Sequence, residues 1–222
     1  TLAPYFDQAE RMLGVEVNPF FSPSDAAVKA VAERMGRGDT FRMTPLGVHF
    51  GEAGKTVEDP YFGGVGPART GCTNCGECMT GCRHGAKNTL VKNYLYLAEQ
   101  AGAQVVAETT VADIREPAEG GFELSVRGSS AWRGSGQRSI RAGQVIVAAG
   151  ALGTAKLLQK VRAGGNLQGL SDRLGHLSRT NSESLLGVVA RGDDVDYSQG
   201  AAITSSIFPS PDTHIEPVRY GK

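Results

Sequence analysis

An apolar run that passes directly into a helix pattern constrains the fold of this 222-residue chain more than any other feature. The run reads VIVAAGALGTAKLL and covers residues 145–158. A short, continuous apolar segment is typical of a parallel strand that is buried on both faces. Gly143 and Gly150 bound it, and they leave too few residues for a helix. We therefore expect an α/β fold, with a central parallel strand over residues 143–149 and a helix over residues 151–162.

The turn at Gly150 is a candidate for contact with a cofactor. In open α/β sheets, ligands bind at the carboxyl ends of such strands. Gly150 removes a side chain where the backbone can approach a ligand, and the N-terminus of the next helix attracts anionic groups. The dinucleotide fingerprint G-x-G-x-x-G is absent from the chain. A tight turn in any doubly wound fold remains the alternative.

The remaining elements follow from periodicity and from stop signals. Helical spacing and terminal glycines predict helices over residues 1–13, 24–36 and 87–102, with Ser24 or Asp25 and Asn88 or Thr89 as caps. Apolar and alternating runs predict an irregular strand over 41–52, a strand with a bulge over 103–117, a strand over 120–128 and a β-rich segment over 185–220. His49 falls in the irregular strand, and we interpret it as a packing residue.

All four cysteines of the chain lie in one run, GCTNCGECMTGC, at Cys72, Cys75, Cys78 and Cys82. The spacing C-x2-C-x2-C-x3-C is that of bacterial ferredoxins, although Arg83 stands where those proteins have proline. Zinc usually binds two separated C-x2-C pairs, so this spacing suits zinc less well. An iron–sulfur cluster, a zinc ion, and free thiols or disulfides are all open interpretations. Arg83, His84 and Lys87 follow the run, where they form an anion site or a solvated cap.

Composition excludes some classes of function. Lys and Arg number 23, and Asp and Glu also number 23, so no basic surface for nucleic acid is expected. No stretch approaches the roughly 20 apolar residues of a transmembrane helix. The chain begins without Met or a signal-peptide pattern, which indicates an internal piece of a longer protein. We expect a cytoplasmic protein, although any targeting signal would lie outside this piece.

Several linked motifs resemble the glucose–methanol–choline (GMC) oxidoreductase family, and within it a cholesterol-oxidase-like subgroup. They are TPLGVHFGEAGKTVEDPYFGG, GCTNCGECMTGCRHGAKNTL, GAKNTLVKNYLYLAEQAGAQVV, TTVADI and VIVAAGALGTAKLL, and the resemblance covers roughly residues 40–220. It implies a doubly wound FAD-binding portion with an interleaved α+β substrate domain, both incomplete here. Residues 84–178 would belong to the FAD domain, and residues 1–83 and 179–222 to the substrate domain.

The same resemblance implies a cofactor and its contacts. The family binds FAD and oxidises alcohols by hydride transfer to the flavin. Val111 occupies the position at which the family's strand holds the adenine end of FAD through its backbone, and Gly150 occupies the turn against the cofactor. The family's N-terminal G-x-G-x-x-G segment and its C-terminal catalytic His and Asn have no counterpart here, so we expect this piece to be inactive alone.

The resemblance also implies a substrate class and a candidate catalytic residue. A hydrophobic alcohol, possibly a sterol, would be oxidised, with dioxygen or another acceptor taking the electrons. Glu216 lies where related proteins carry a glutamate that handles protons, and we expect it to face a cleft between the 185–220 sheet and strand 143–149. A surface position is the alternative for Glu216. Two other functions remain open: a flavin dehydrogenase coupled to an Fe–S or quinone acceptor, and a non-enzymatic metal or thiol module.

Overall fold

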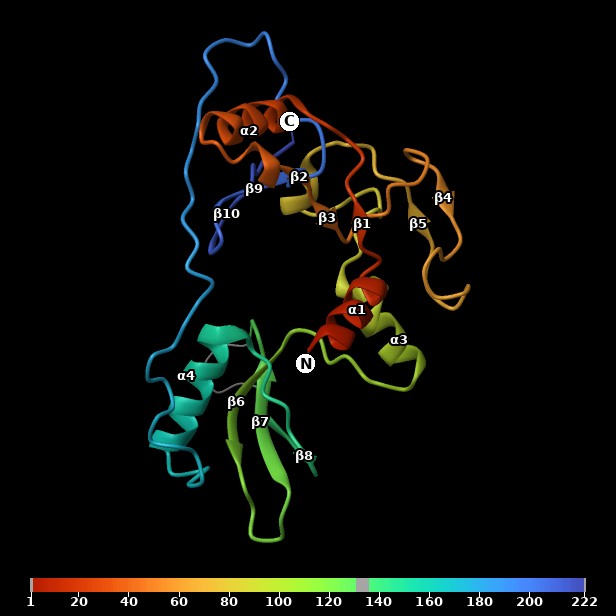
Figure 1. Cartoon of the computed structure of the whole chain (residues 1–222). Coiled ribbons are helices and arrows are strands. Elements are labelled where there is room, and N and C mark those ends of the chain that lie inside the picture. The colour runs from red at the N-terminus through yellow and green to blue at the C-terminus, as the bar shows by residue number, and fades with distance from the viewer. Residues whose placement is uncertain (1, 131–135, 222) are drawn as a thin grey trace. The chain divides into compact units, whose positions relative to one another are not determined.

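The computed structural model describes residues 2–130 and 136–221 and divides into two compact units. Unit 1 comprises Thr1–Gln104 together with Val189–Lys222, and unit 2 comprises Val105–Val188. Figure 1 shows the chain passing from unit 1 to unit 2 after α3 and returning after α4. Each unit is described by itself below.

The helices of unit 1 begin and end where local signals place them. They are α1 (Ala3–Met12), α2 (Pro23–Arg34) and α3 (Tyr94–Gln100), with short 3-10 turns at Gly38–Thr40, Glu77–Met79 and Leu90–Lys92. A capping box starts α2, because Ser22 accepts from the Asp25 backbone while the Asp25 side chain accepts from the Ser22 backbone. The cap is thus Ser22, two residues before the predicted Ser24.

The strands of unit 1 form three small sheets. β1 (Glu16–Val17) pairs with β3 (Pro45–Leu46), β4 (Thr56–Val57) pairs with β5 (Arg69–Thr70), and β9 (Ser205–Ser210) lies between β2 (Arg42–Met43) and β10 (Thr213–Ile215). The pairing of β2 with β9 brings residues 42–43 and 205–206 together in one sheet. Segments from before and after unit 2 therefore fold as one body.

A buried carboxylate joins α2 to β9. Asp25 has no exposed surface, and its Oδ1 accepts hydrogen bonds of 2.5 Å from the hydroxyls of Thr204 and Ser205. Its Oδ2 accepts from the backbone and the hydroxyl of Ser22. Burial alone would raise the pKa of Asp25, but the hydroxyl groups of Ser205, Ser22 and Thr204 outweigh burial and lower this pKa. Ala32 and Ile207 complete the apolar contact around this junction.

Unit 2 is a three-stranded antiparallel sheet beside one helix. Its strands are β6 (Thr109–Arg115), β7 (Phe122–Gly128) and β8 (Arg138–Ala142), in the order β6-β7-β8, and its helix is α4 (Gly150–Ala163). Figure 1 shows α4 beside β6. Ile114, Val126 and Val161 are almost fully buried between the sheet and the helix. The register of β6 against β7 shifts between Val111 and Asp113, which confirms the predicted bulge.

Three sequence predictions differ from the structure. Residues 143–149 form no strand, and Ile146 is 92% exposed, so the prediction of a buried parallel strand is wrong here. A strand needs hydrogen-bonded neighbours, and no described segment pairs with these residues. Residues 185–189 are likewise exposed and extended, without strand pairing. The helix predicted from residue 87 begins only at Tyr94, because Asn93 caps it there.

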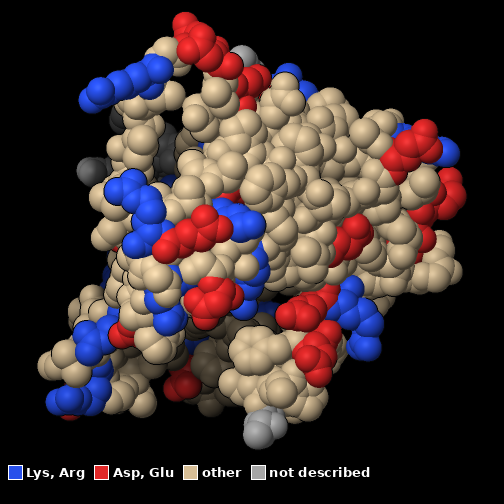
Figure 2. All heavy atoms as spheres, turned by 45° about the horizontal axis from the view of Figure 1, so that its top comes forward, with Lys and Arg blue, Asp and Glu red and all other residues tan. Residues whose placement is uncertain are grey.

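The architecture is therefore a mixed α/β fold with several small sheets, in which all pairings between the described strands are antiparallel. Among residues 2–130 and 136–221, no helix has the length and apolar character that spanning a bilayer demands. Basic and acidic side chains are interspersed on the face that Figure 2 shows, in keeping with the equal counts of the two charges. The assignment of residues 84–178 to an FAD domain and of 1–83 and 179–222 to a substrate domain stays a prediction.

Candidate functional site

Val111 lies on β6, whose outer edge has no neighbouring strand among the described residues. It is opposite Val126 of β7 and half-buried. The bulge that follows it turns the strand, and Lys160 of α4 donates to the Ala112 carbonyl at 2.7 Å. Backbone groups on a free strand edge are able to bind a ligand, since no ladder uses them. The position of Val111 is compatible with the predicted backbone contact to an adenine ring.

Gly150 forms the turn that starts α4. Its φ of +73° lies in the left-handed region, which favours glycine. A Cβ added at Gly150 would meet no heavy atom within 4 Å, so the space beside the turn is open. The hydroxyl of Thr154 accepts a hydrogen bond of 3.0 Å from the Ala149 backbone, which fixes the entry to the helix. An open glycine turn at a helix N-terminus fits one side of a nucleotide cofactor.

Glu216 follows the last residue of β10. Its side chain is 27% exposed, and its Oε1 lies 3.5 Å from Nε2 of His214. The His214 ring stacks on Phe208 at a centroid distance of 4.5 Å. The segments expected to border a cleft at Glu216 lie in different units, and residues 143–149 form no strand. The catalytic role of Glu216 therefore stays a prediction.

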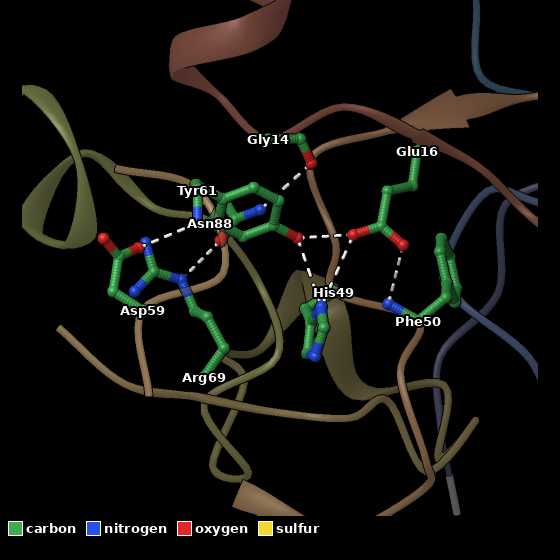
Figure 3. A network of polar contacts seen from close by, with 8 residues as sticks. All are labelled: Gly14, Glu16, His49, Phe50, Asp59, Tyr61, Arg69 and Asn88. Carbon is green, nitrogen blue, oxygen red and sulfur yellow. Dashed lines mark hydrogen bonds and ion pairs between the residues drawn. The ribbon is translucent and has the colours of Figure 1, made fainter. Parts of the chain in front are cut away.

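A network of polar contacts, drawn in Figure 3, joins five segments of unit 1. At its centre the carboxylate of Glu16 accepts from the Tyr61 hydroxyl at 2.5 Å and from the Phe50 backbone at 3.1 Å. Nδ1 of His49 lies 3.4 Å from both Glu16 Oε1 and the Tyr61 hydroxyl. Burial, and next the hydrogen bond to Glu16, raise the pKa of Tyr61, so this hydroxyl stays protonated as a donor.

The other half of the network is centred on a buried arginine. Arg69 is 1% exposed and donates to the Asn88 side chain at 2.6 Å and to the Lys92 carbonyl at 2.5 Å. Asn88 in turn donates to the Gly14 carbonyl at 3.1 Å. The guanidinium lies 5.5 Å from the centre of the Tyr61 ring and thus connects the two halves. Because nearly every polar group has a partner, the network holds segments together.

The four cysteines surround one small cavity. Cys72, Cys75, Cys78 and Cys82 all line it, together with the apolar side chains of Val48 and Ala86 and with His84. All four are free thiols of intermediate exposure. The structure thus brings together the residues that the sequence singled out as one site.

The electrostatic environment differs between the ends of this run. Burial raises the pKa of the Cys72 thiol, and the neighbouring Cys78, Cys75 and Cys82 raise it further. Burial would also raise the pKa of Cys82, but the backbone N–H groups of residues 87, 86, 84 and 85 outweigh burial and lower it. A lowered pKa favours the thiolate form of Cys82.

Sequence reasoning missed Glu16, Tyr61, Arg69 and Asn88. These residues come from separate segments and share no spacing, so no local pattern indicates the network. His49 was interpreted as a packing residue, and it does lie in the network, half-buried against the Tyr61 ring with centroids 6.0 Å apart. The sequence predicts Asp25 only as a possible cap, and its hydrogen bonds to Thr204 and Ser205 have no sequence signal.

Comparisons with known proteins place these residues in a family. The family model described as GMC oxidoreductase matches residues 65–177, slightly more than half of the chain. Cholesterol oxidases of Mycobacterium tuberculosis strains CDC 1551 / Oshkosh and ATCC 25618 / H37Rv are each 56% identical over 228 residues, covering 100% of this chain and 39% of theirs. A cholesterol oxidase of Acinetobacter baumannii is 48% identical over 225 residues, covering 97% of this chain and 40% of its own length. The chain spans about two fifths of the length of these relatives, and it belongs to the GMC oxidoreductase family.

Proposed function

We propose that this chain is part of an FAD-dependent oxidoreductase that oxidises the CH–OH group of a hydrophobic alcohol, with a sterol as substrate. One observation carries the proposal: cholesterol oxidases are 56% identical to this chain over its whole length. Identity at this level supports a shared backbone course, and the open turn at Gly150 is the turn that we propose to contact the cofactor. The described strands form only antiparallel pairs, whereas a doubly wound FAD-binding sheet is mostly parallel. That sheet is therefore part of this proposal for the full-length protein.

The residues of this chain would perform three tasks. FAD, when bound, supplies the acceptor for the hydride of the alcohol carbon. The backbone of Val111 on the free edge of β6 holds the adenine end of the cofactor, and Gly150 leaves room for it beside α4. Glu216 takes up the proton of the alcohol hydroxyl, a role for which a partly buried carboxylate is suited. Dioxygen is the proposed final electron acceptor.

The test uses the full-length protein. After purification, the flavin released by denaturation is quantified, and oxidation of cholesterol is followed by the hydrogen peroxide formed. A water-soluble short-chain alcohol at the same concentration is the control for the substrate class. Bound FAD with faster turnover of the sterol supports the proposal. A protein that binds no flavin refutes the cofactor, and equal or faster turnover of the short alcohol refutes the hydrophobic substrate.

A dehydrogenase with another acceptor is the second candidate, because the cysteine cavity offers a place for a redox group. Turnover that is slow with dioxygen and fast with a soluble quinone would favour this candidate over an oxidase. Membership of an oxidoreductase family gives no support to a non-enzymatic metal or thiol module. A cytoplasmic location remains part of the proposal, and fractionation of cells that express the full-length protein tests it.

A further inference from the structure

We propose that Cys72, Cys75, Cys78 and Cys82 bind a [4Fe–4S] cluster in the cavity that they line. This inference goes beyond the oxidation of an alcohol and does not depend on it. Three features of the molecule support it: the course of the loop, its anchoring by a distant segment, and the charges around the cavity.

The course of the loop turns each sulfur toward the same centre. Each spacer between consecutive cysteines contains one residue with a left-handed backbone: Asn74 (φ 59°), Gly76 (φ 76°) and Gly81 (φ 112°). Such residues reverse the chain direction, so the loop curls around the cavity instead of extending past it. Met79 and Thr80 in the last spacer are exposed, so this part of the loop has room to widen around a bound group.

A distant segment anchors the loop. Cys75 forms an isolated parallel β-bridge with Gly200, and the Gly200 backbone donates to the Asn74 carbonyl at 2.8 Å. Ser198 and Gly221 approach Gly76 so closely that a Cβ at this position would clash with their backbones. On the other side, the His49 carbonyl accepts from the Cys72 backbone at 2.9 Å. These contacts hold the first half of the loop in place, so Cys72 and Cys75 are presented at low entropic cost.

The charges around the cavity favour an anionic group. Lys87 lines the cavity and donates to the Cys78 carbonyl at 3.1 Å. Arg219 is 6% exposed and acts electrostatically on Cys78, while Lys92 does so on Cys82. Glu77 is the acidic residue that lines the cavity, and the exposed Arg83 pairs with it. A cluster held by four thiolates carries net negative charge, and hydrogen bonds to its sulfurs tune it.

A backbone donor already contacts one of the sulfurs. The Asn74 backbone donates to the Cys72 sulfur at 3.4 Å. Hydrogen bonds from backbone N–H groups to sulfur are one means by which proteins set the potential of iron–sulfur clusters.

The spacing of the run favours a cluster over a single zinc ion. Zinc usually binds two separated C-x2-C pairs, whereas C-x2-C-x2-C-x3-C is the spacing of bacterial ferredoxins, in which cysteines hold the cluster. All four cysteines line a common cavity, and none forms a disulfide. In the described part of the chain, no group of three or more His, Cys, Asp or Glu is placed to hold a metal ion, so binding requires the exposed part of the loop at Met79 and Thr80 to move.

The test measures metal and sulfide in the full-length protein, purified without oxygen. We expect about four iron atoms and about four acid-labile sulfides per chain, and an electron paramagnetic resonance signal after reduction with dithionite. Because the flavin also absorbs visible light, chemical analysis and resonance replace the absorption spectrum as the deciding measurements. Zinc in place of iron, or iron without sulfide, overturns the proposal. So does a protein that stays free of iron after treatment with ferrous iron and sulfide.

A pair of variants links the cluster to the loop. Cys78→Ala is expected to lower the iron content at least fivefold while the flavin content stays unchanged. Met79→Leu alters the neighbouring residue, which is 53% exposed, and should keep the iron of the wild type. Equal iron in Cys78→Ala and the wild type would overturn the assignment of this ligand. If Cys78→Ala does not fold, the metal and sulfide content of the wild type still decides the question.

Discussion

Substitution of Gly150 by Val tests whether the turn before α4 contacts the flavin. Gly150 has φ +73°, and a side chain there would enter space that no heavy atom of the chain occupies within 4 Å. Two effects are superimposed in this variant. An L-residue in the left-handed region costs about 1–2 kcal/mol, and a β-branched one is at the upper end of this range. In addition, the valine side chain introduced at Gly150 would occupy space that we propose for the cofactor, which would weaken flavin binding.

Gly165 separates these two effects. It lies just after the other end of α4, has φ +77°, and also has no heavy atom within 4 Å of an added Cβ. Gly165→Val therefore carries a similar backbone cost of about 1–2 kcal/mol without touching the proposed cofactor turn. Both variants should lower the Tm of the full-length protein by similar amounts. Only Gly150→Val should weaken flavin retention, by about tenfold for each 1.4 kcal/mol of lost contact.

The assay is the ratio of flavin to protein after desalting, with Tm measured on the same samples. Flavin retention in Gly150→Val at the wild-type level would show that the turn lies away from the cofactor. An equal loss of flavin in Gly165→Val would show that strain in α4, and not contact at the turn, governs retention. Either result refutes the reasoning.

Three further predictions concern single side chains of the full-length protein. Glu216→Gln should lower alcohol turnover at least tenfold with flavin content unchanged. The control Asp212→Asn, in the neighbouring hairpin, should leave turnover near the wild-type value. Equal turnover in Glu216→Gln and the wild type would remove Glu216 from the mechanism. Asp25→Asn should lower the free energy of unfolding by about 3 kcal/mol, since it weakens hydrogen bonds to a buried charge, including that from Thr204. Because the pKa of Asp25 is lower in the folded state, its stabilising effect is complete above the unfolded pKa of 3.8 and is lost as the pH falls through the folded pKa. Denaturant titrations should show this acid dependence in the wild type and not in Asp25→Asn. Tyr61 should stay protonated near pH 10, where ordinary tyrosines ionise, so Tyr61→Phe should leave the ultraviolet titration in that range unchanged.

Local patterns predicted the elements whose determinants are local. The helix over residues 1–13, the strand over 120–128 and the bulge near Val111 are all present, because periodicity and stop residues within each segment specify them. The start of α3 was predicted seven residues too early, since the side chain of Asn88 is held by Arg69 and by the Gly14 carbonyl and does not cap a helix. Such distant partners leave no trace in local sequence.

The candidate sites divide in the same way. The cysteine cavity was predictable because all four cysteines that line it lie within one short run. The network of Glu16, His49 and Tyr61 was not, because its members meet only after distant segments have packed. The composition of the apolar run at 143–149 predicted a strand, and this prediction is wrong for the described structure. A strand requires hydrogen-bonded partner strands, and the composition of one segment does not reveal whether they are present.

The anchoring of the cysteine loop by residues 198–221 has a consequence for the order of events during synthesis. The cysteines leave the ribosome more than a hundred residues before Gly200 and Gly221, which complete their surroundings. At 5–20 residues per second, this interval lasts on the order of 10 s. During that time four thiols are present on an unfinished loop, accessible to oxidants and to stray metal ions. Delivery of a metal group to the nascent chain would therefore compete with these reactions, and residues 198–221 would then pack against whatever the loop holds.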